Sequence, residues 1–256
     1  MKTKKEKGTQ ILNYEGVRKL RKINLDIALQ PMMTNATIEY IASILEPSDI
    51  VFEYGSGGST TVFSQLVKKY ISVEHEPEWF NKIKNRCSNI KSVESYHVEP
   101  NCRKIEPDMG VPPAHYETLF CADTHGRGIM TKESYENLQR DFPYALEGPH
   151  YSSILRYYQF QDYVNKIYDV GVDKFDKILI DGRSRTFCAY IARHFMHKDS
   201  ILLIDDILSD HPRYRADDPD GTSRPASRLE IEFGNTLGAF YEEVMAIDGL
   251  LAVRLK

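Results

Sequence analysis

The sequence predicts an α/β fold built around one mostly parallel sheet, and two observations carry this prediction. Between residues 49 and 98, short apolar runs alternate with helical stripes, which is the rhythm of parallel strands joined by crossover helices. Near the C-terminus, the β-like runs 239–247 and 250–255 are joined by Asp248-Gly249, a dipeptide that two-residue hairpin turns favour. We therefore expect a parallel sheet that ends in an antiparallel hairpin.

The size and composition fit one large domain. The chain has 256 residues, of which 41% are hydrophobic and 27% charged, so it can bury a core. The formal net charge of -4 does not favour a protein that coats phosphate backbones, and we expect no nucleic-acid partner. The four cysteines form no CxxC pair, and no run of about 18 apolar residues occurs. These features predict a cytoplasmic protein without a membrane partner.

The first half of the chain supplies three strands. Residues 1–30 are interpreted as an N-terminal tail and leading segment, because the first ten residues are rich in lysine. The domain itself is expected over 31–256. Its first elements alternate in type: helix 35–45, strand 49–54, helix 62–67 after a glycine turn, strand 70–74, helix 77–87 and strand 92–98.

The second half resumes this rhythm after an interruption. Prolines and glycines break any long element over about 99–150, which predicts an insertion, either a lid or acceptor-binding surface or a decoration without such a role. The expected elements then are helix 151–172, strand 174–181, helix 186–196, strand 199–206, and a polar loop over 209–227.

Acidic residues stand where the predicted strands end. Ligands of open parallel sheets bind beyond the carboxyl ends of the strands, so these positions are informative. The acidic residues at these ends are Glu53, Glu74, Glu99, Asp181 and the pair Asp205-Asp206. Such surroundings favour hydroxyl-rich or cationic ligands, or a divalent metal, over a bare phosphate.

The glycine turn after the first strand carries a family resemblance. Residues 53–60 read EYGSGGST, and Thr60 stands where a dinucleotide fingerprint needs its third glycine. The segment instead resembles motif I of the class I S-adenosylmethionine-dependent methyltransferases, with Gly58 added directly after Gly57. Glycines there let main-chain N–H groups approach a cofactor.

This resemblance implies a Rossmann-like, seven-stranded, mostly parallel sheet with helices on both faces and a C-terminal antiparallel hairpin. It also implies a binding site for S-adenosyl-L-methionine, the methyl donor, made of Glu53, Gly55, Ser56, Gly57, Ser59 and Glu74. Glu74 follows Glu53 by twenty-one residues and would accept hydrogen bonds from the ribose hydroxyls. The alternative for Glu74 is a solvated surface glutamate.

Three aspartates form a candidate metal site. Asp181, Asp205 and Asp206 follow two neighbouring strands, and this set resembles the metal site of magnesium-dependent O-methyltransferases of the catechol and sugar types. Such a set can hold Mg²⁺ or another divalent cation and leave room for two vicinal hydroxyls. The alternative is that these aspartates only stabilise the turns after their strands.

Other side chains near the ends of the predicted strands each have two possible interpretations. His211 is the candidate general base, and Asp181 a second catalytic candidate; a histidine exposed on a loop is the alternative for His211. Arg183 and Arg185 would clamp an acceptor anion, or pair with surface acids. Five tyrosines would stack on a sugar or pack in a helical core: Tyr151, Tyr157, Tyr158, Tyr163 and Tyr168.

The function that these features predict is transfer of a methyl group from S-adenosyl-L-methionine to a hydroxyl of a sugar or other polyhydroxylated acceptor, a small molecule or a glycan, with metal assistance left open. Two alternatives remain: an NAD(P)-dependent oxidoreductase, which also uses a glycine turn and an acidic residue, and a non-catalytic binding module on a methyltransferase scaffold. Whether the chain forms a homo-oligomer is also left open.

Overall fold

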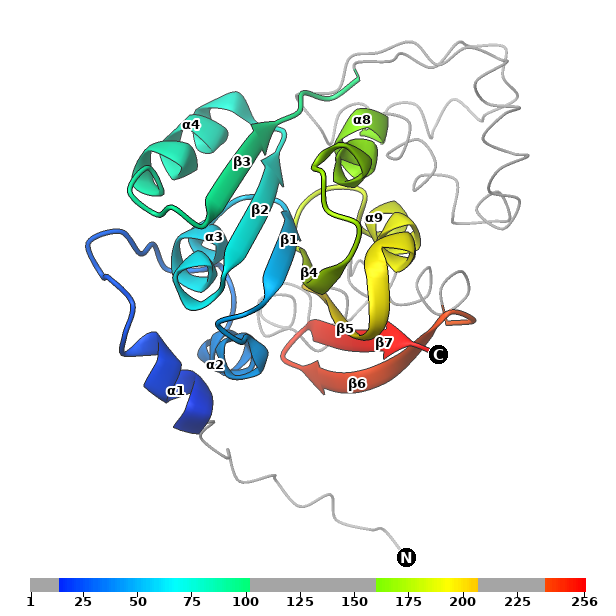
Figure 1. Cartoon of the computed structure of the whole chain (residues 1–256), viewed down its shortest axis with the longest axis horizontal. Helices are drawn as coiled ribbons and strands as arrows, with labels where there is room; N and C mark the ends of the chain where they lie inside the picture. The colour runs from blue at the N-terminus through cyan, green and yellow to red at the C-terminus, as the bar shows by residue number, and fades with distance from the viewer. Residues whose placement is uncertain (1–13, 102–159, 207–237) are drawn as a thin grey trace, which may run out of the picture.

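The computed structural model describes residues 14–101, 160–206 and 238–256, which form a seven-stranded sheet in the order β3-β2-β1-β4-β5-β7-β6 (Figure 1). Strands β1 to β5 are parallel, and β7 runs antiparallel to both β5 and β6. The strands are β1 (Ile50–Tyr54), β2 (Lys69–Glu74), β3 (Val93–His97), β4 (Phe175–Ile180), β5 (Met196–Ile204), β6 (Tyr241–Ile247) and β7 (Leu250–Leu255). The predicted fold class is confirmed.

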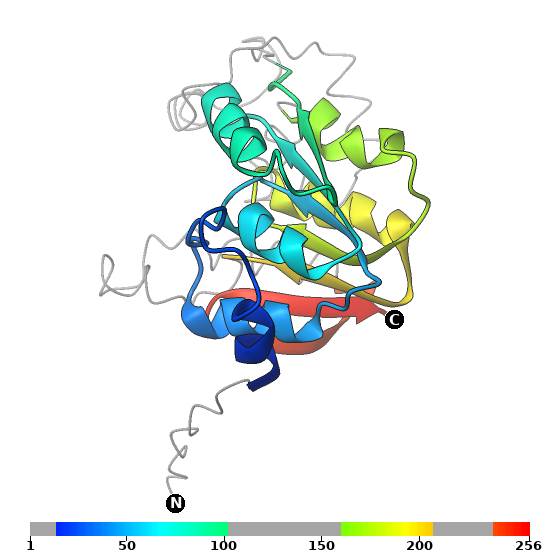
Figure 2. The same cartoon turned by 60° about the vertical axis from the view of Figure 1, so that its left-hand side comes forward.

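Helices cover both faces of the sheet (Figure 2). The α-helices are α1 (Tyr14–Leu20), α2 (Asn35–Ile44), α3 (Gly58–Phe63), α4 (Pro77–Arg86), α8 (Gln161–Asn165) and α9 (Arg185–Ala192). Three short 3-10 helices extend them: η1 (Ser64–Leu66), η4 (Lys166–Asp169) and η5 (Arg193–Phe195). None of the helices in these described ranges is long and apolar enough to cross a membrane.

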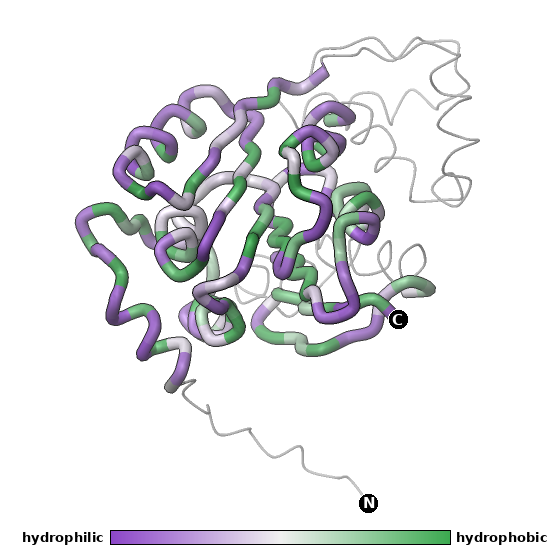
Figure 3. The backbone as a smooth tube through the Cα atoms, viewed as in Figure 1, coloured by the Kyte–Doolittle hydropathy of each residue, from purple (hydrophilic) through white to green (hydrophobic). Residues whose placement is uncertain are grey.

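Each face of the sheet has its own core. On one face, α8 and α9 pack over an aromatic group in which Phe52 lies 4.8 Å from Tyr54 and 5.3 Å from Phe175, measured between ring centroids. On the other face, α2 and α3 cover aliphatic residues of the central strands, such as Val51 and Leu179. Because both faces are covered, β1 and β4 are buried along most of their length and are mostly apolar (Figure 3), with Glu53, Asp176 and Lys177 as the charged exceptions.

Several element boundaries differ from the sequence prediction, and two of these differences have a clear structural cause. Helix α3 begins at Gly58, inside the glycine turn and not at residue 62, because Gly57 serves as its N-cap. Strand β5 begins at Met196, three residues before the predicted start. A bulge explains this difference: the Ser200 hydroxyl donates to the carbonyl of Phe175 (2.6 Å) and accepts from the N–H of His197 (2.8 Å), which keeps the irregular segment paired with β4.

The hairpin turn is confirmed in detail. Asp248 and Gly249 have φ values of 46° and 96°, the two positive φ angles that a type I′ turn requires. The turn joins β6 to β7, and β7 pairs with β5.

The leading segment before residue 31 contains a helix that the sequence pattern did not predict. Helix α1 packs closely on α2, since a Cβ atom on Gly16 would lie 1.9 Å from the carbonyl oxygen of Glu39. The ammonium of Lys19 donates to the carbonyls of Ser43 and Leu45 at the end of α2 (3.0 and 2.6 Å). Most of this segment's length is therefore part of the folded unit.

Candidate active site

The site lies where the strand order reverses, beyond the carboxyl ends of β1 and β4. The segments that follow these two strands are in close contact: a Cβ atom on Gly55 would lie 2.7 Å from the Cα of Gly182. Gly55 also has a φ of 96°, and a Cβ atom on Gly182 would lie 2.0 Å from the hydroxyl of Tyr163. Close packing within the protein therefore requires glycine at both positions, whether or not a ligand binds.

Glu53 stabilises the glycine turn through hydrogen bonds to its buried carboxylate. Its fully buried carboxylate accepts hydrogen bonds from the hydroxyls of Ser59 (2.5 Å), Thr60 (2.5 Å) and Ser72 (2.9 Å). The Thr60 hydroxyl in turn accepts the N–H of Gly57 at 2.8 Å. The sequence predicts Glu53 and Ser59 as donor-binding residues; the structure places both side chains inside the turn, where they set its shape.

Burial raises the pKa of Glu53 to about 7, even though the donated hydrogen bonds oppose this change. A carboxylate in this position is costly to ionise, and its hydroxyl partners compensate only in part. The brace under the turn is therefore sensitive to pH near neutrality.

The other positions of the turn differ in what faces them. A Cβ atom on Gly58 would lie 2.5 Å from the carbonyl oxygen of Gln30, so packing alone explains that glycine. Ser56 is buried, and its hydroxyl shares a hydrogen bond with that of Ser72 (2.6 Å). Among the residues that the structure describes, a Cβ atom on Gly57 would have only the Ser59 hydroxyl near it, at 3.7 Å. Gly57 thus presents the open side of the turn.

Glu74 ends β2 next to this turn. It is only 4% exposed, so the alternative of a solvated surface glutamate is wrong. Its Oε1 accepts the N–H groups of His75 and Glu76, both at 2.9 Å, and lies 2.8 Å from Nδ1 of His75. Oε2 has no partner in the described part of the chain, which leaves it to accept hydroxyl groups of a ligand.

Trp79 joins the site without having been predicted there. Its indole N–H donates to the carbonyl of Ser56 at 2.6 Å, so it ties the start of α4 to the glycine turn. Its ring is half-buried, with the Lys82 ammonium 4.3 Å from the ring centroid. The helical spacing of Trp79 with Phe80 and Ile83 is typical of core residues. Its place soon after Glu74, in the first turn of a helix that follows a strand exit, is the signal that could have placed it in the site.

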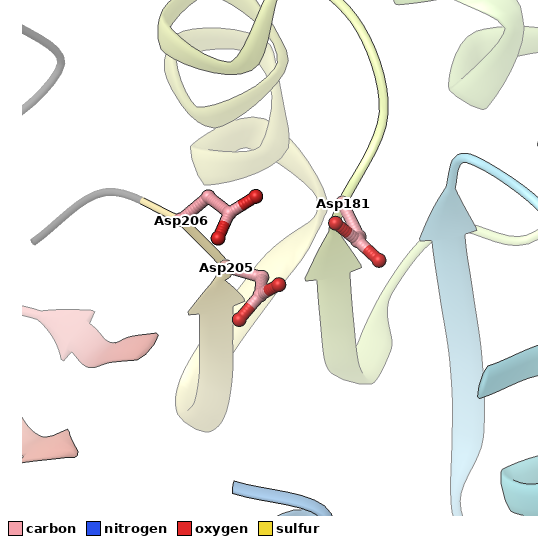
Figure 4. A group of neighbouring side chains, drawn as sticks. All are labelled: Asp181, Asp205 and Asp206. Carbon is pink, nitrogen blue, oxygen red and sulfur yellow. The ribbon is translucent and has the colours of Figure 1, made fainter. Parts of the chain in front are cut away.

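The three predicted metal ligands come together at the ends of β4 and β5 (Figure 4). One carboxylate oxygen from each of Asp181, Asp205 and Asp206 lies within 4.8 Å of the others. Asp205 and Asp206 are buried, and Asp206 has a left-handed φ of 53°. The name acidic cluster is used below for these three aspartates.

Arg185, the first residue of α9, lies within the acidic cluster. Its Nη2 is 3.3 Å from Oδ1 of Asp181 and 3.7 Å from Oδ2 of Asp206. Its Nε donates to the carbonyl of Gly182 at 3.0 Å, and its Nη1 donates to the carbonyl of Asp205. Burial raises the pKa of Asp181, with Asp205 and Asp206 adding to the rise and Arg185 opposing it.

Several predicted residues fall elsewhere. His211, the loop 209–227, Tyr151, Tyr157 and Tyr158 lie outside the described residues, as do residues 1–10 and most of the 99–150 insertion. Tyr163 is fully buried and packs 5.6 Å from Tyr54 (ring centroids), which confirms the core-packing interpretation for it, whereas Tyr168 is about half exposed.

A scan against protein-family models and a search of curated proteins found no match. Among solved structures, the chain is similar to a methyltransferase-like protein from Silicibacter pomeroyi, with 19% identity, a TM-score of 0.51 and 90% of each chain covered. A putative methyltransferase from Streptococcus mutans in complex with SAH has 9% identity and a TM-score of 0.47 over 89% of this chain and 100% of that one. An O-methyltransferase from Bacillus cereus in complex with SAH has 10% identity and a TM-score of 0.42 over 82% of this chain and 75% of that one.

The first of these similarities agrees with the strand order and with the antiparallel hairpin at the end of the sheet. The chain therefore has the fold of class I S-adenosylmethionine-dependent methyltransferases.

Proposed function

We propose that this protein transfers a methyl group from S-adenosyl-L-methionine to a hydroxyl of a sugar or another polyhydroxylated small molecule. The observation that carries the donor half of this proposal is the buried Glu74 carboxylate beside the open face of Gly57. Oε1 of Glu74 is held by two main-chain N–H groups, which fixes the direction of Oε2. A fixed carboxylate oxygen can accept both ribose hydroxyls of a nucleoside.

The geometry of the turn favours this donor over a dinucleotide. A pyrophosphate binds to main-chain N–H groups where a helix begins. Here the N–H of Gly57 donates to the Thr60 hydroxyl instead, and Thr60 occupies the place of the third fingerprint glycine. The N–H of Gly57 is therefore used within the turn and is not free to bind a phosphate. This suits S-adenosyl-L-methionine, which has no phosphate.

The acidic cluster supports an acceptor rich in hydroxyls. Methyl transfer to an alcohol needs the nucleophilic oxygen in line with the sulfonium, and a group that takes up the proton. The side chain of Asp181 is 21% exposed, more than those of its two neighbours in the cluster, and it directly precedes the Gly182 turn, which touches the donor turn. We assign to Asp181 the role of orienting the acceptor hydroxyl and accepting its proton.

The same cluster suits a hard divalent cation in its donor set. Oxygens bound to one octahedral Mg²⁺ lie about 3 Å apart, or about 4.2 Å apart when they stand on opposite sides of the ion, so the cluster, whose oxygens lie within 4.8 Å of one another, would have to contract around this ion. Asp181, Asp205 and Asp206 would be the ligands. A bound cation would orient two vicinal hydroxyls and lower the pKa of the one that reacts.

Turnover tests the proposal directly. We expect labelled S-adenosyl-L-methionine to give S-adenosylhomocysteine and a methyl ether when the protein is incubated with a panel of sugars, polyols and catechols. Donor binding without turnover on any acceptor would instead support the binding-module alternative.

Replacement of both Asp205 and Asp206 by Asn should abolish the part of the activity that EDTA inhibits. Activity that is indifferent to the chelator would reject the cation.

A further inference from the structure

We propose that Arg185 is the resident cation of the acidic cluster, so that a divalent ion binds there only by displacing its guanidinium group. This inference rests on the cation site of the proposed function, and it adds a residue that controls the occupancy of that site.

The contacts of Arg185 place it among the atoms that a metal would need. Nη2 approaches Oδ1 of Asp181 and Oδ2 of Asp206, at 3.3 and 3.7 Å, and these two oxygens belong to the candidate ligand residues. The side chain is only 16% exposed, and its Nε and Nη1 bind the carbonyls of Gly182 and Asp205. The guanidinium therefore bridges the two strand ends that carry the cluster.

Charge makes the two occupants exclusive. A divalent ion held by these carboxylates would lie within a few ångströms of the guanidinium carbon, and like charges at that separation repel strongly where little water enters. The arginine remains charged at all physiological pH values, so it cannot relieve this repulsion by losing its proton. It has to leave when the ion enters.

The internal arginine also offsets the repulsion within the acidic cluster. Three neighbouring carboxylates with restricted access to water repel one another and are costly to bury together. One guanidinium in their midst offsets part of that cost, and its hydrogen bonds to two carbonyls hold it there. The sequence also suggested that Arg185 clamps an acceptor anion. To do so, Arg185 would have to break its hydrogen bonds to these two carbonyls.

Binding of Mn²⁺ to the complete protein, followed by electron paramagnetic resonance and calorimetry at fixed ionic strength, tests this inference without any turnover. We expect Arg185→Gln to bind Mn²⁺ at least about tenfold more tightly than the wild type, because a competing charge has been removed. Arg185→Lys should lie between the two, since its ammonium keeps the charge without the forked donors; it also serves if the glutamine variant does not fold.

A matched control separates displacement from a change in net charge. Arg193 lies just after α9, with its guanidinium 4.2 Å from the ring centroid of Tyr190 and 4.5 Å from that of Phe240. Arg193→Gln removes the same charge away from the cluster and should leave the Mn²⁺ affinity unchanged. The tighter binding of Arg185→Gln should disappear when Asp205→Asn and Asp206→Asn are added.

Three results would overturn the inference: equal Mn²⁺ affinity for Arg185→Gln and the wild type, binding in neither, or a gain that survives loss of both aspartates. Titration of the same samples with S-adenosylhomocysteine reports the donor site separately. A failed donor titration alongside a tenfold Mn²⁺ effect would reject the proposed function and leave the role of Arg185 standing.

Discussion

The two halves of the site are built by different means. On the donor side, the carboxylate of Glu53 is enclosed by three hydroxyl groups, and Glu74 is fixed by two main-chain N–H groups. On the proposed acceptor side, three carboxylates lie together, and one guanidinium contacts those of Asp181 and Asp206 and makes hydrogen bonds to carbonyls of two strand ends. The first half is held by short hydrogen bonds to the local chain, and the second by charges that a ligand can replace.

Under the proposed function, this difference would allow one fold to keep its donor site while the acceptor varies. The shape of the donor half is set by glycines and by the hydroxyls of Ser59, Thr60 and Ser72, which bind the Glu53 carboxylate, so we expect it to change little when a ligand binds. Occupancy in the acceptor half is set by the balance of charges, which a cation or a hydroxyl can shift by entering. A rigid donor half and an acceptor half whose occupancy can change thus lie side by side at the same edge of the sheet.

The largest expected effect breaks the contact between the halves. Gly55→Ala should lower the free energy of unfolding by about 3 kcal/mol or more, because it combines a positive φ with a Cβ atom 2.7 Å from the Cα of Gly182. Gly57→Ala is the matched control: among the described residues its Cβ atom would meet only the Ser59 hydroxyl, at an ordinary contact distance of 3.7 Å, so stability should change by only about 1 kcal/mol while donor affinity falls on the order of tenfold. Chemical denaturation and calorimetry measure the two effects. A Gly57→Ala variant that binds donor normally would remove the turn from the donor site.

The second effect is a pH dependence that belongs to the donor half. The pKa of Glu53 is about 7 in the folded protein and 4.5 when unperturbed, so the folded state holds this proton more tightly than the unfolded state. Its contribution to stability is therefore greatest below pH 4.5, falls by about 3 kcal/mol between pH 4.5 and 7, and stays level above. Glu53→Gln should remove this decline.

Denaturation of both proteins at several pH values measures this difference. Glu78→Gln, which removes an exposed glutamate of α4, should retain the decline of the wild type. If the wild type and Glu53→Gln lose stability in parallel from pH 4.5 to 7, the buried carboxylate does not titrate as described.

A smaller effect sharpens the comparison at Glu74. The amide oxygen of Glu74→Gln can still accept the N–H groups of His75 and Glu76, so the fold should be retained. The loss of negative charge should weaken S-adenosylhomocysteine binding by about 10- to 100-fold, the range for hydrogen bonds to a charged group. Trp79 is the only tryptophan of the chain and is bonded to the glycine turn, so its fluorescence reports this binding. Unchanged affinity would exclude Glu74 from the site.

The strand pattern, the hairpin turn and the meeting of the three aspartates were all predictable from the sequence. Each depends on local information: apolar runs, the Asp248-Gly249 dipeptide, and the rule that parallel strands end at one edge. Helix α1 was harder to predict, because Tyr14, Val17 and Leu20 repeat at helical spacing over only seven residues and the helix is held by a close approach at Gly16.

The roles of individual side chains were harder to predict for a physical reason. Strands β1 and β2 are both buried on their two faces, so alternation cannot show that Glu53 points under the turn while Glu74 borders its open side. Thr60 looked like a departure from a glycine motif, and only the structure shows its hydroxyl linking Gly57 to Glu53. The position of Arg185 depends on contacts between two strand ends that lie far apart in the sequence.

Calorimetric titration of the wild type and Glu74→Gln with S-adenosylhomocysteine and with NAD tests the central claim most directly. The account predicts a single site for S-adenosylhomocysteine in the wild type, weaker binding to the variant, and no heat from NAD with either protein. Binding of NAD by the wild type, with no response to S-adenosylhomocysteine, would contradict it.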